Sequence, residues 1–257
     1  MRALEEEPLG GGNTTAGVVR VGGTVRRPAG PWSPTVHALL QHLDAVGFEH
    51  APRSLGFDDR ERHVLEYVPG EAAHPFAAAD HTVACRRVGA LLRELHDATA
   101  TFTPPADAHW NVVIEPDATD LVVHHDPAPW NLVVGDDDRW VLIDWDNAGP
   151  GSRTWDLAYA AIGFVPLTPG TPPADAASRL AALADGYRLD EAGRVRLLDR
   201  LERRAAAMAD LLADGHRTGT EPWAGLHEAG HTDTWRAQAA FARRHLDAFR
   251  TGLRRGR

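Results

Sequence analysis

The chain has 257 residues, of which 43% are hydrophobic and 25% are charged, as expected for a globular protein with a sizeable core. Its net charge of −9 argues against a nucleic-acid partner, and no apolar run is long enough to span a membrane. We therefore expect neither nucleic acid nor membrane as a partner. The single cysteine, Cys85, excludes an internal disulfide framework, and the first seven residues lack the pattern of a signal peptide, so we expect a cytoplasmic protein.

The basic residues have an unusual composition, because all 27 of them are arginine and the chain contains no lysine. A P-loop is therefore excluded, since its lysine must reach the terminal phosphates of the nucleotide. Any side chain that binds a phosphate group through positive charge has to be an arginine.

A glycine-rich stretch precedes the first predicted hairpin, whose strands span residues 18–21 and 24–27 around Gly22 and Gly23. Such a stretch allows backbone N–H groups to approach the phosphates of a nucleotide, although glycine runs also occur in ordinary turns. The candidate nucleotide-binding residues here are Gly11, Gly12, Asn13 and Thr14.

The next elements predicted are a helix that starts at Ser33-Pro34 and ends at Gly47, and a strand over residues 64–68. Pro69-Gly70 follows this strand and indicates a turn or a linker. We place a boundary here, between an N-terminal part of residues 1–68 and a C-terminal part of residues 69–257. Beyond it, apolar spacing predicts a helix around residues 88–95, a helix capped by Asp190 and ending at Gly215, and another from Trp235 to Phe249.

Between these helices lies the stretch with the clearest chemical signal, which reads as strand, polar loop, strand, acidic turn and strand. The loop has the pattern His-x-Asp-x-x-x-x-Asn at His124, Asp126 and Asn131, and Asp144 stands at the end of the last strand. Phosphoryl transfer to an alcohol needs a carboxylate beside the hydroxyl, and an amide oxygen and a second carboxylate as magnesium ligands. A hairpin between Asn131 and Asp144 would bring both oxygen ligands to the same end of a sheet.

At these residues the chain resembles the aminoglycoside phosphotransferase family of small-molecule kinases. The resemblance implies a two-lobed, protein-kinase-like α/β (α+β) fold, with a small N-terminal sheet lobe carrying one helix and a larger, mostly helical C-terminal lobe. It also implies that Asp126 is the catalytic base, that Asn131 and Asp144 hold Mg²⁺, and that His124 braces the loop. Asp156 resembles a family aspartate that accepts hydrogen bonds from the loop backbone, while helix capping is its alternative role.

The resemblance assigns further residues to the nucleotide. Arg26 stands where kinases carry the strand lysine that contacts the phosphates, and Arg27 is the competing register. The helix glutamate that pairs with this lysine aligns with His37, whose role is open. Glu66 and Val68 lie in the segment that joins the lobes in the family, where backbone groups bind the purine.

The reaction implied is transfer of the γ-phosphoryl group of ATP or GTP to a hydroxyl of a small molecule. The short spacing from Asp144 to Asp156 disfavours a peptide acceptor. An aminoglycoside or another hydroxylated antibiotic is the leading acceptor class, and the negative net charge is compatible with a cationic one. A metabolite kinase acting on a sugar, an amino-alcohol or a nucleoside is the alternative, and a catalytically silent nucleotide-binding module is less favoured.

One motif points to different chemistry. His227-Glu228-Ala229-Gly230-His231 fits the His-Glu-x-x-His pattern of zinc metalloproteases, which requires both histidines on one helix and a third ligand. Glycines in and before the motif disfavour that helix, and no glutamate follows Glu228. We therefore rank a zinc metalloprotease well below the kinase.

Overall fold

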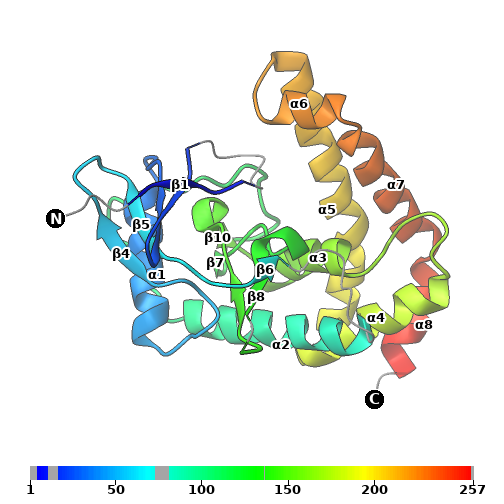
Figure 1. Cartoon of the computed structure of the whole chain (residues 1–257). Helices are drawn as coiled ribbons and strands as arrows, with labels where there is room; N and C mark the ends of the chain where they lie inside the picture. Colours follow the sequence, from blue (N-terminus) through cyan, green and yellow to red (C-terminus); the bar gives the residue numbers. More distant parts are fainter. Residues whose placement is uncertain (1–4, 11–16, 73–80, 136, 256–257) are drawn as a thin grey trace.

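The structure is a computed structural model that describes residues 5–10, 17–72, 81–135 and 137–255. It has two parts, an antiparallel sheet with one helix near the N-terminus and a mostly helical part that follows (Figure 1). Four candidate phosphate-binding residues lie outside the described residues, so their role stays a prediction: Gly11, Gly12, Asn13 and Thr14.

The N-terminal sheet has five strands in the order β1-β2-β3-β5-β4. Their bounds are Glu7–Pro8 for β1, Val19–Val21 for β2, Thr24–Arg27 for β3, Ser54–Phe57 for β4 and His63–Glu66 for β5. The predicted hairpin is present as β2 and β3, and Gly22 adopts a positive φ of 60° in the turn between them. This turn geometry explains why glycine is favoured there, since a side chain would strain it.

The helix of this lobe, α1 (Ser33–Ala45), packs on the sheet through the apolar face expected from its sequence. Val36, Leu39, Leu40 and Leu43 are all at most 1% exposed. Gly47 follows the helix with a φ of +79°, the left-handed conformation in which many helices end. Both predicted ends of this helix are therefore confirmed to within two residues.

The C-terminal lobe contains two small sheets. One joins β6 (Glu71–Ala72), β8 (Leu132–Val134) and β9 (Trp140–Leu142), and the other joins β7 (Leu121–Val123) and β10 (Gly149–Gly151). Two short 3₁₀ helices connect them, η1 at Pro129–Asn131 and η2 at Trp145–Asn147. These strands and connections form the predicted central hairpin and its flanks.

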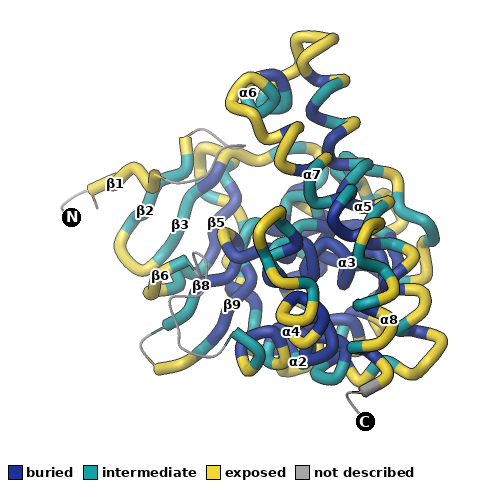
Figure 2. The backbone as a smooth tube through the Cα atoms, turned by 90° about the vertical axis from the view of Figure 1, so that its right-hand side faces the viewer, coloured by how far each residue is buried: buried dark blue, intermediate teal, exposed yellow. Residues whose placement is uncertain are grey.

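Helices cover this hairpin and make up most of the lobe (Figure 1). Their bounds are His81–Thr99 for α2, Arg153–Phe164 for α3, Pro173–Gly186 for α4, Glu191–Thr218 for α5, Trp223–Glu228 for α6, His231–Arg244 for α7 and Leu246–Arg255 for α8. Helix α3 lies against α5 and α2, and Figure 2 shows it deep in the buried core, whereas α6 projects at the periphery. Among the described residues, no helix is both long enough and apolar enough to cross a membrane.

Two helix boundaries differ from the sequence prediction. Helix α5 continues past Gly215 to Thr218, and Gly219 provides its left-handed end. Gly215 is instead a site of close packing, since a Cβ there would collide with Trp223. The single helix predicted from Trp235 to Phe249 is interrupted at His245, which separates α7 from α8. The two-lobed kinase-like fold is confirmed, while the boundary between residues 68 and 69 stays a prediction.

Candidate active site

The central hairpin brings the expected oxygen ligands together. Leu132 on β8 pairs with Leu142 on β9, and the Ile143 N–H donates to the Asn131 carbonyl over 2.8 Å. Asn131 and Asp144 therefore lie at the same end of the hairpin, as predicted. Their neighbourhood is fixed by local backbone pairing over about a dozen residues rather than by long-range packing.

The carboxylate of Asp126 lies directly beside Asn131. The Asn131 side-chain amide donates to the Asp126 Oδ2 over 2.8 Å and to its backbone carbonyl over 3.0 Å. The other oxygen, Oδ1, is buried and accepts no hydrogen bond of ordinary geometry within the described residues, although the Tyr159 hydroxyl lies nearby. This leaves one carboxylate oxygen available to accept a proton.

Burial raises the pKa of Asp126 to about 7, and the charge of Asp144 adds to this rise, while the nearby Tyr159 hydroxyl and the Asn131 amide oppose it. A carboxylate with a pKa close to neutral is a stronger proton acceptor than one at its usual value near 4. The environment of Asp126 therefore suits a general base.

His124 makes the contacts of a bracing residue. It is fully buried, and burial lowers its pKa. The backbone N–H of Asp126 donates to its Nδ1 over 3.3 Å, so Nε2 carries the proton and donates to the Ile143 carbonyl over 3.1 Å. One neutral imidazole thus ties the loop before Asp126 to the strand before Asp144.

The donor atoms at the hairpin end fit a hard divalent cation. Because the Asn131 NH₂ group is engaged by Asp126, its side-chain oxygen is left as an acceptor. Asp144 adopts a left-handed backbone with a φ of 61°, an uncommon conformation for a residue with a side chain. Oxygen atoms of this kind are the ligands that Mg²⁺ prefers, so the residues fit the implied metal.

Arg27, rather than Arg26, reaches this end of the hairpin. Its Nη2 lies 2.9 Å from the Asp144 Oδ1 and 2.6 Å from the Asp146 Oδ2, and the residue is 7% exposed. Arg26 faces the other side of β3, where it donates to the Thr24 hydroxyl over 2.7 Å and lies 3.5 Å from the Asp58 carboxylate. The structure places Arg27, the competing register, at this end, since neighbouring residues on a strand point to opposite faces. A role of either arginine in nucleotide binding stays a prediction.

His37, which stands where kinases carry a glutamate, lies in a chain of polar contacts between α1 and the strand β4. Its Nδ1 lies 2.7 Å from the Ser54 hydroxyl, and the same hydroxyl lies 2.7 Å from the His63 Nε2. Burial lowers the pKa of His63 to about 4, and the charges of His37 and Arg27 contribute. The low pKa of His63 indicates that it is neutral in this network, which lies between α1 and the strands β4 and β5.

The segment between the lobes is partly engaged in structural contacts. The Glu66 carboxylate accepts from the Arg53 N–H over 3.1 Å and from Arg139 over 3.4 Å, and the Glu66 N–H donates to the Arg53 carbonyl. Val68 follows in a half-buried position outside any strand. Their predicted role in purine binding stays a prediction.

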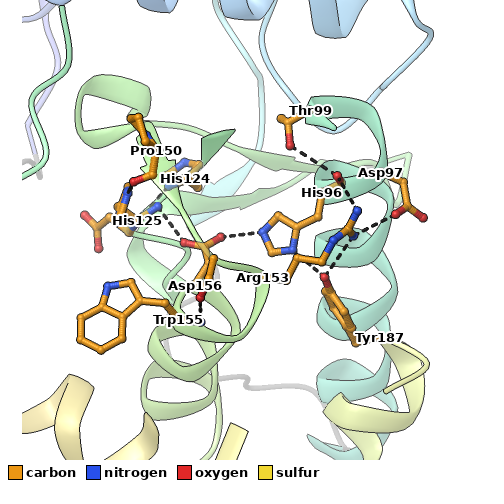
Figure 3. A network of polar contacts seen from close by, with 12 residues as sticks. His96, Asp97, Thr99, His124, His125, Pro150, Arg153, Trp155, Asp156 and Tyr187 are labelled. Carbon is orange, nitrogen blue, oxygen red and sulfur yellow. Dashed lines mark hydrogen bonds and ion pairs between the residues drawn. The ribbon is translucent and has the colours of Figure 1, made fainter. Parts of the chain in front are cut away.

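Asp156 holds the loop that carries Asp126, and Figure 3 shows its carboxylate between His125 and His96. Its Oδ1 accepts from the His125 N–H over 2.7 Å, and its Oδ2 lies 3.1 Å from the His96 Nε2, with all three residues buried. His96 continues to the Tyr187 hydroxyl over 2.8 Å. Asp156 therefore holds the loop backbone, as its resemblance implied, and links it to α2 and α4.

The sequence analysis missed three residues of this region: Asp146, His96 and Tyr187. Asp146 follows Asp144 by two positions, so its place beside the predicted metal ligand was a usable signal. His96 contacts Asp156 over a separation of 60 residues, Tyr187 contacts His96 over 91 residues, and no local pattern marks either of them.

The metalloprotease motif does not form the helix that a zinc site needs. Helix α6 ends at Glu228 and α7 begins at His231, with Gly230 in a left-handed conformation between them. His227 stacks on His216 at 4.3 Å and lies 2.9 Å from the Thr232 hydroxyl. Within the described residues, no group of three or more His, Cys, Asp or Glu side chains is arranged to hold a metal.

Comparisons with known proteins also point to the segment that carries the loop and the hairpin. A model of the phosphotransferase enzyme family matches residues 106–198, the segment with Asp126, Asn131 and Asp144. The trifolitoxin immunity protein of Rhizobium leguminosarum bv. trifolii is 42% identical over 156 residues. This match spans 59% of the chain and 58% of the relative, less than two thirds of the relative's length.

Three solved structures share the fold. A spectinomycin phosphotransferase in complex with ADP and spectinomycin gives a TM-score of 0.61 at 10% identity, covering 94% of this chain and 92% of the other. A choline/ethanolamine kinase family protein from Mesorhizobium loti gives 0.58 at 17% identity, covering 96% and 92%. A microcompartment-associated aminopropanol kinase gives 0.59 at 16% identity, covering 91% and 89%.

At these low identities the solved structures establish the fold alone. The family match is specific to the segment with the loop and hairpin, and the fold match extends over nearly the whole chain. The resemblance to the phosphotransferases is therefore confirmed as a similarity: residues 106–198 match the model of the phosphotransferase enzyme family, and the fold is shared over nearly the whole chain.

Proposed function

We propose that the chain transfers the γ-phosphoryl group of ATP or GTP to a hydroxyl group of a small molecule. The observation that carries this proposal is the convergence of Asp126, Asn131 and Asp144 at one end of a hairpin, with Arg27 reaching the same place from the other lobe. This set provides a base, two metal ligands and a cation for phosphate, which are the parts that phosphoryl transfer requires.

Each of these residues has a distinct task in the proposed reaction. Asp126 accepts the proton of the acceptor hydroxyl on its unpaired Oδ1, while Asn131 keeps the carboxylate oriented. Asn131 and Asp144 hold Mg²⁺, which neutralises phosphate charge when it is bound with the nucleotide. Arg27 supplies the positive charge that a lysine supplies in protein kinases, in a chain without lysine.

We infer that the acceptor is a hydroxylated antibiotic or a related toxin. The support is the relative named as an immunity protein, which is 42% identical over a segment of 156 residues. Spectinomycin is bound in one of the structures with the same fold, at 10% identity. A metabolite such as an amino-alcohol is the alternative acceptor, and the same assay distinguishes the two classes.

The test is a screen for nucleotide consumption with ATP and GTP over hydroxylated antibiotics, sugars, nucleosides and amino-alcohols. The Asp126→Asn variant is the control for each positive acceptor, and mass spectrometry identifies the phosphorylated product. We expect turnover that requires Mg²⁺ or Mn²⁺ and that persists with a zinc-selective chelator. Failure of every acceptor, in a protein that does bind nucleotide, would favour the silent nucleotide-binding module.

A further inference from the structure

In protein kinases a glutamate on the helix of the N-terminal lobe pairs with the strand lysine, and no such glutamate is present on α1. The question is what orients Arg27, the proposed phosphate-binding cation. The only acidic residue in α1 is Asp44, in the last turn, and His37 is turned to the Ser54 hydroxyl. The cation is nevertheless paired, because its Nη2 lies 2.6 Å from Asp146. The carboxylate that approaches it most closely therefore comes from the C-terminal lobe.

We propose that Asp146 is a positioning residue that anchors Arg27 for phosphate binding in place of a carboxylate on α1. This inference rests on the proposed function, since it concerns the same nucleotide site. It differs from a kinase-like arrangement in one physical respect: the cation on β3 is oriented by the other lobe rather than by the helix of its own lobe.

Asp146 is well placed to act as an anchor, because its backbone is held by the core. It lies in η2 beside Trp145, which is 2% exposed and donates from its Nε1 to the Leu142 carbonyl over 2.8 Å. The Trp145 ring also packs against His124 at 4.7 Å. The left-handed turn at Asp144 precedes this rigid unit, and both carboxylates reach the same nitrogen of Arg27.

The two carboxylates beside Arg27 are expected to respond differently when a nucleotide binds. Asp144 is a predicted metal ligand, so its oxygen atoms are drawn toward Mg²⁺ when the nucleotide binds. Asp146 has a partly buried side chain, 14% exposed, and a short contact with the guanidinium. A charge-assisted hydrogen bond of this kind keeps the guanidinium in place while the Asp144 contact changes. Arg27 is thereby held ready for the phosphates by a carboxylate of the C-terminal lobe.

A double-mutant cycle tests this inference, using Arg27→Met, Asp146→Asn and the combined variant. The readout is the dissociation constant of ADP with saturating Mg²⁺, measured by calorimetry, which needs no acceptor. We expect each single change to weaken binding about tenfold, and the double variant to bind no more weakly than Arg27→Met alone. Asp146→Glu should recover part of the loss, and Asp120→Asn, a change at an exposed acid, should leave binding unchanged.

Two results would overturn the inference. The first is an Asp146→Asn effect that persists at full size in the Arg27→Met background with a raised Mg²⁺ requirement, because Asp146 would then act on the metal. The second is a wild-type protein that binds no nucleotide, which would remove the proposed function as well. Coupled binding without turnover of any acceptor would instead support the inference and contradict only the phosphotransferase proposal.

Discussion

The two sides of the candidate site are stabilised in different ways. On the C-terminal side, the loop around Asp126 is fixed by buried contacts, including those of the Asp156 carboxylate and the His124 imidazole. On the N-terminal side, Arg27 meets its carboxylate partners across the boundary between the lobes. The base is thus preformed within one lobe, whereas the position of the cation depends on how the two lobes lie relative to each other.

Because of this difference, we expect variants of the loop and variants of Arg27 to affect different steps, turnover in the first case and nucleotide binding in the second. Changes to the loop should affect turnover or folding, because the loop belongs to the core of its lobe. Changes to the arginine should affect nucleotide use while the fold persists. The following variants test that separation, beginning with the largest expected effect.

Asp126→Asn should remove the base and leave the rest of the loop intact. We expect a loss in kcat of about 10²–10⁴-fold with little change in nucleotide affinity, because asparagine has nearly the same shape and does not accept the proton. Steady-state kinetics with a verified acceptor and calorimetry with ADP measure the two effects. Turnover close to that of the wild type would show that another group accepts the proton.

Asp156→Ala should destabilise the C-terminal lobe. It removes the acceptor of the His125 N–H and the partner of His96, all of them buried. We expect the free energy of unfolding to fall by about 3 kcal/mol, as for other broken buried polar pairs. Urea unfolding measures this change, with the exposed Asp233→Ala as the control. A loss below 1 kcal/mol would mean that the loop is fixed mainly by apolar packing.

The buried His63 between α1 and the N-terminal sheet should make stability depend on pH. Burial lowers the pKa of His63 to about 4, whereas an unfolded histidine titrates near 6.5, so protonation favours the unfolded state. Stability from this residue is complete above pH 6.5 and is lost as the pH falls toward 4. We expect His63 to account for a loss of about 2 kcal/mol between pH 7.5 and pH 5.

Urea unfolding at these two pH values measures the contribution of His63. His63→Gln retains a hydrogen-bonding group toward Ser54 but does not titrate, so its stability should fall less than that of the wild type. His231→Gln changes an exposed histidine and serves as the control. Equal pH dependence in the wild type and His63→Gln would contradict a neutral, buried His63.

Arg27→Ala should reduce kcat/KM for the nucleotide about 10- to 100-fold while the fold persists, because a charged hydrogen-bond donor to phosphate is lost. Arg26→Ala should change the same quantity less than threefold, since Arg26 faces Thr24 and Asp58 on the other side of the strand. Kinetics of both variants at varied nucleotide concentration make the comparison. A larger loss at Arg26 would mean that β3 presents its opposite face to the nucleotide.

The sequence by itself determined the chemical core of this protein. Asp126, Asn131 and Asp144 lie within one stretch, and a hairpin between short apolar strands is enough to bring them together. The helix from Ser33 to Gly47 was equally readable, because the proline at its start, the glycine after its end and its apolar spacing act locally. The resemblance to a phosphotransferase family followed from the same short stretch.

The tertiary structure decided which side chains surround that core. Arg26 and Arg27 are identical in type, and the face of β3 that meets the other lobe is set by its pairing with β5. The contacts of Asp156 with His96 and of His96 with Tyr187 join residues 60 and 91 positions apart. Such contacts arise when helices pack together, and that packing depends on the whole apolar surface of each element rather than on a local pattern.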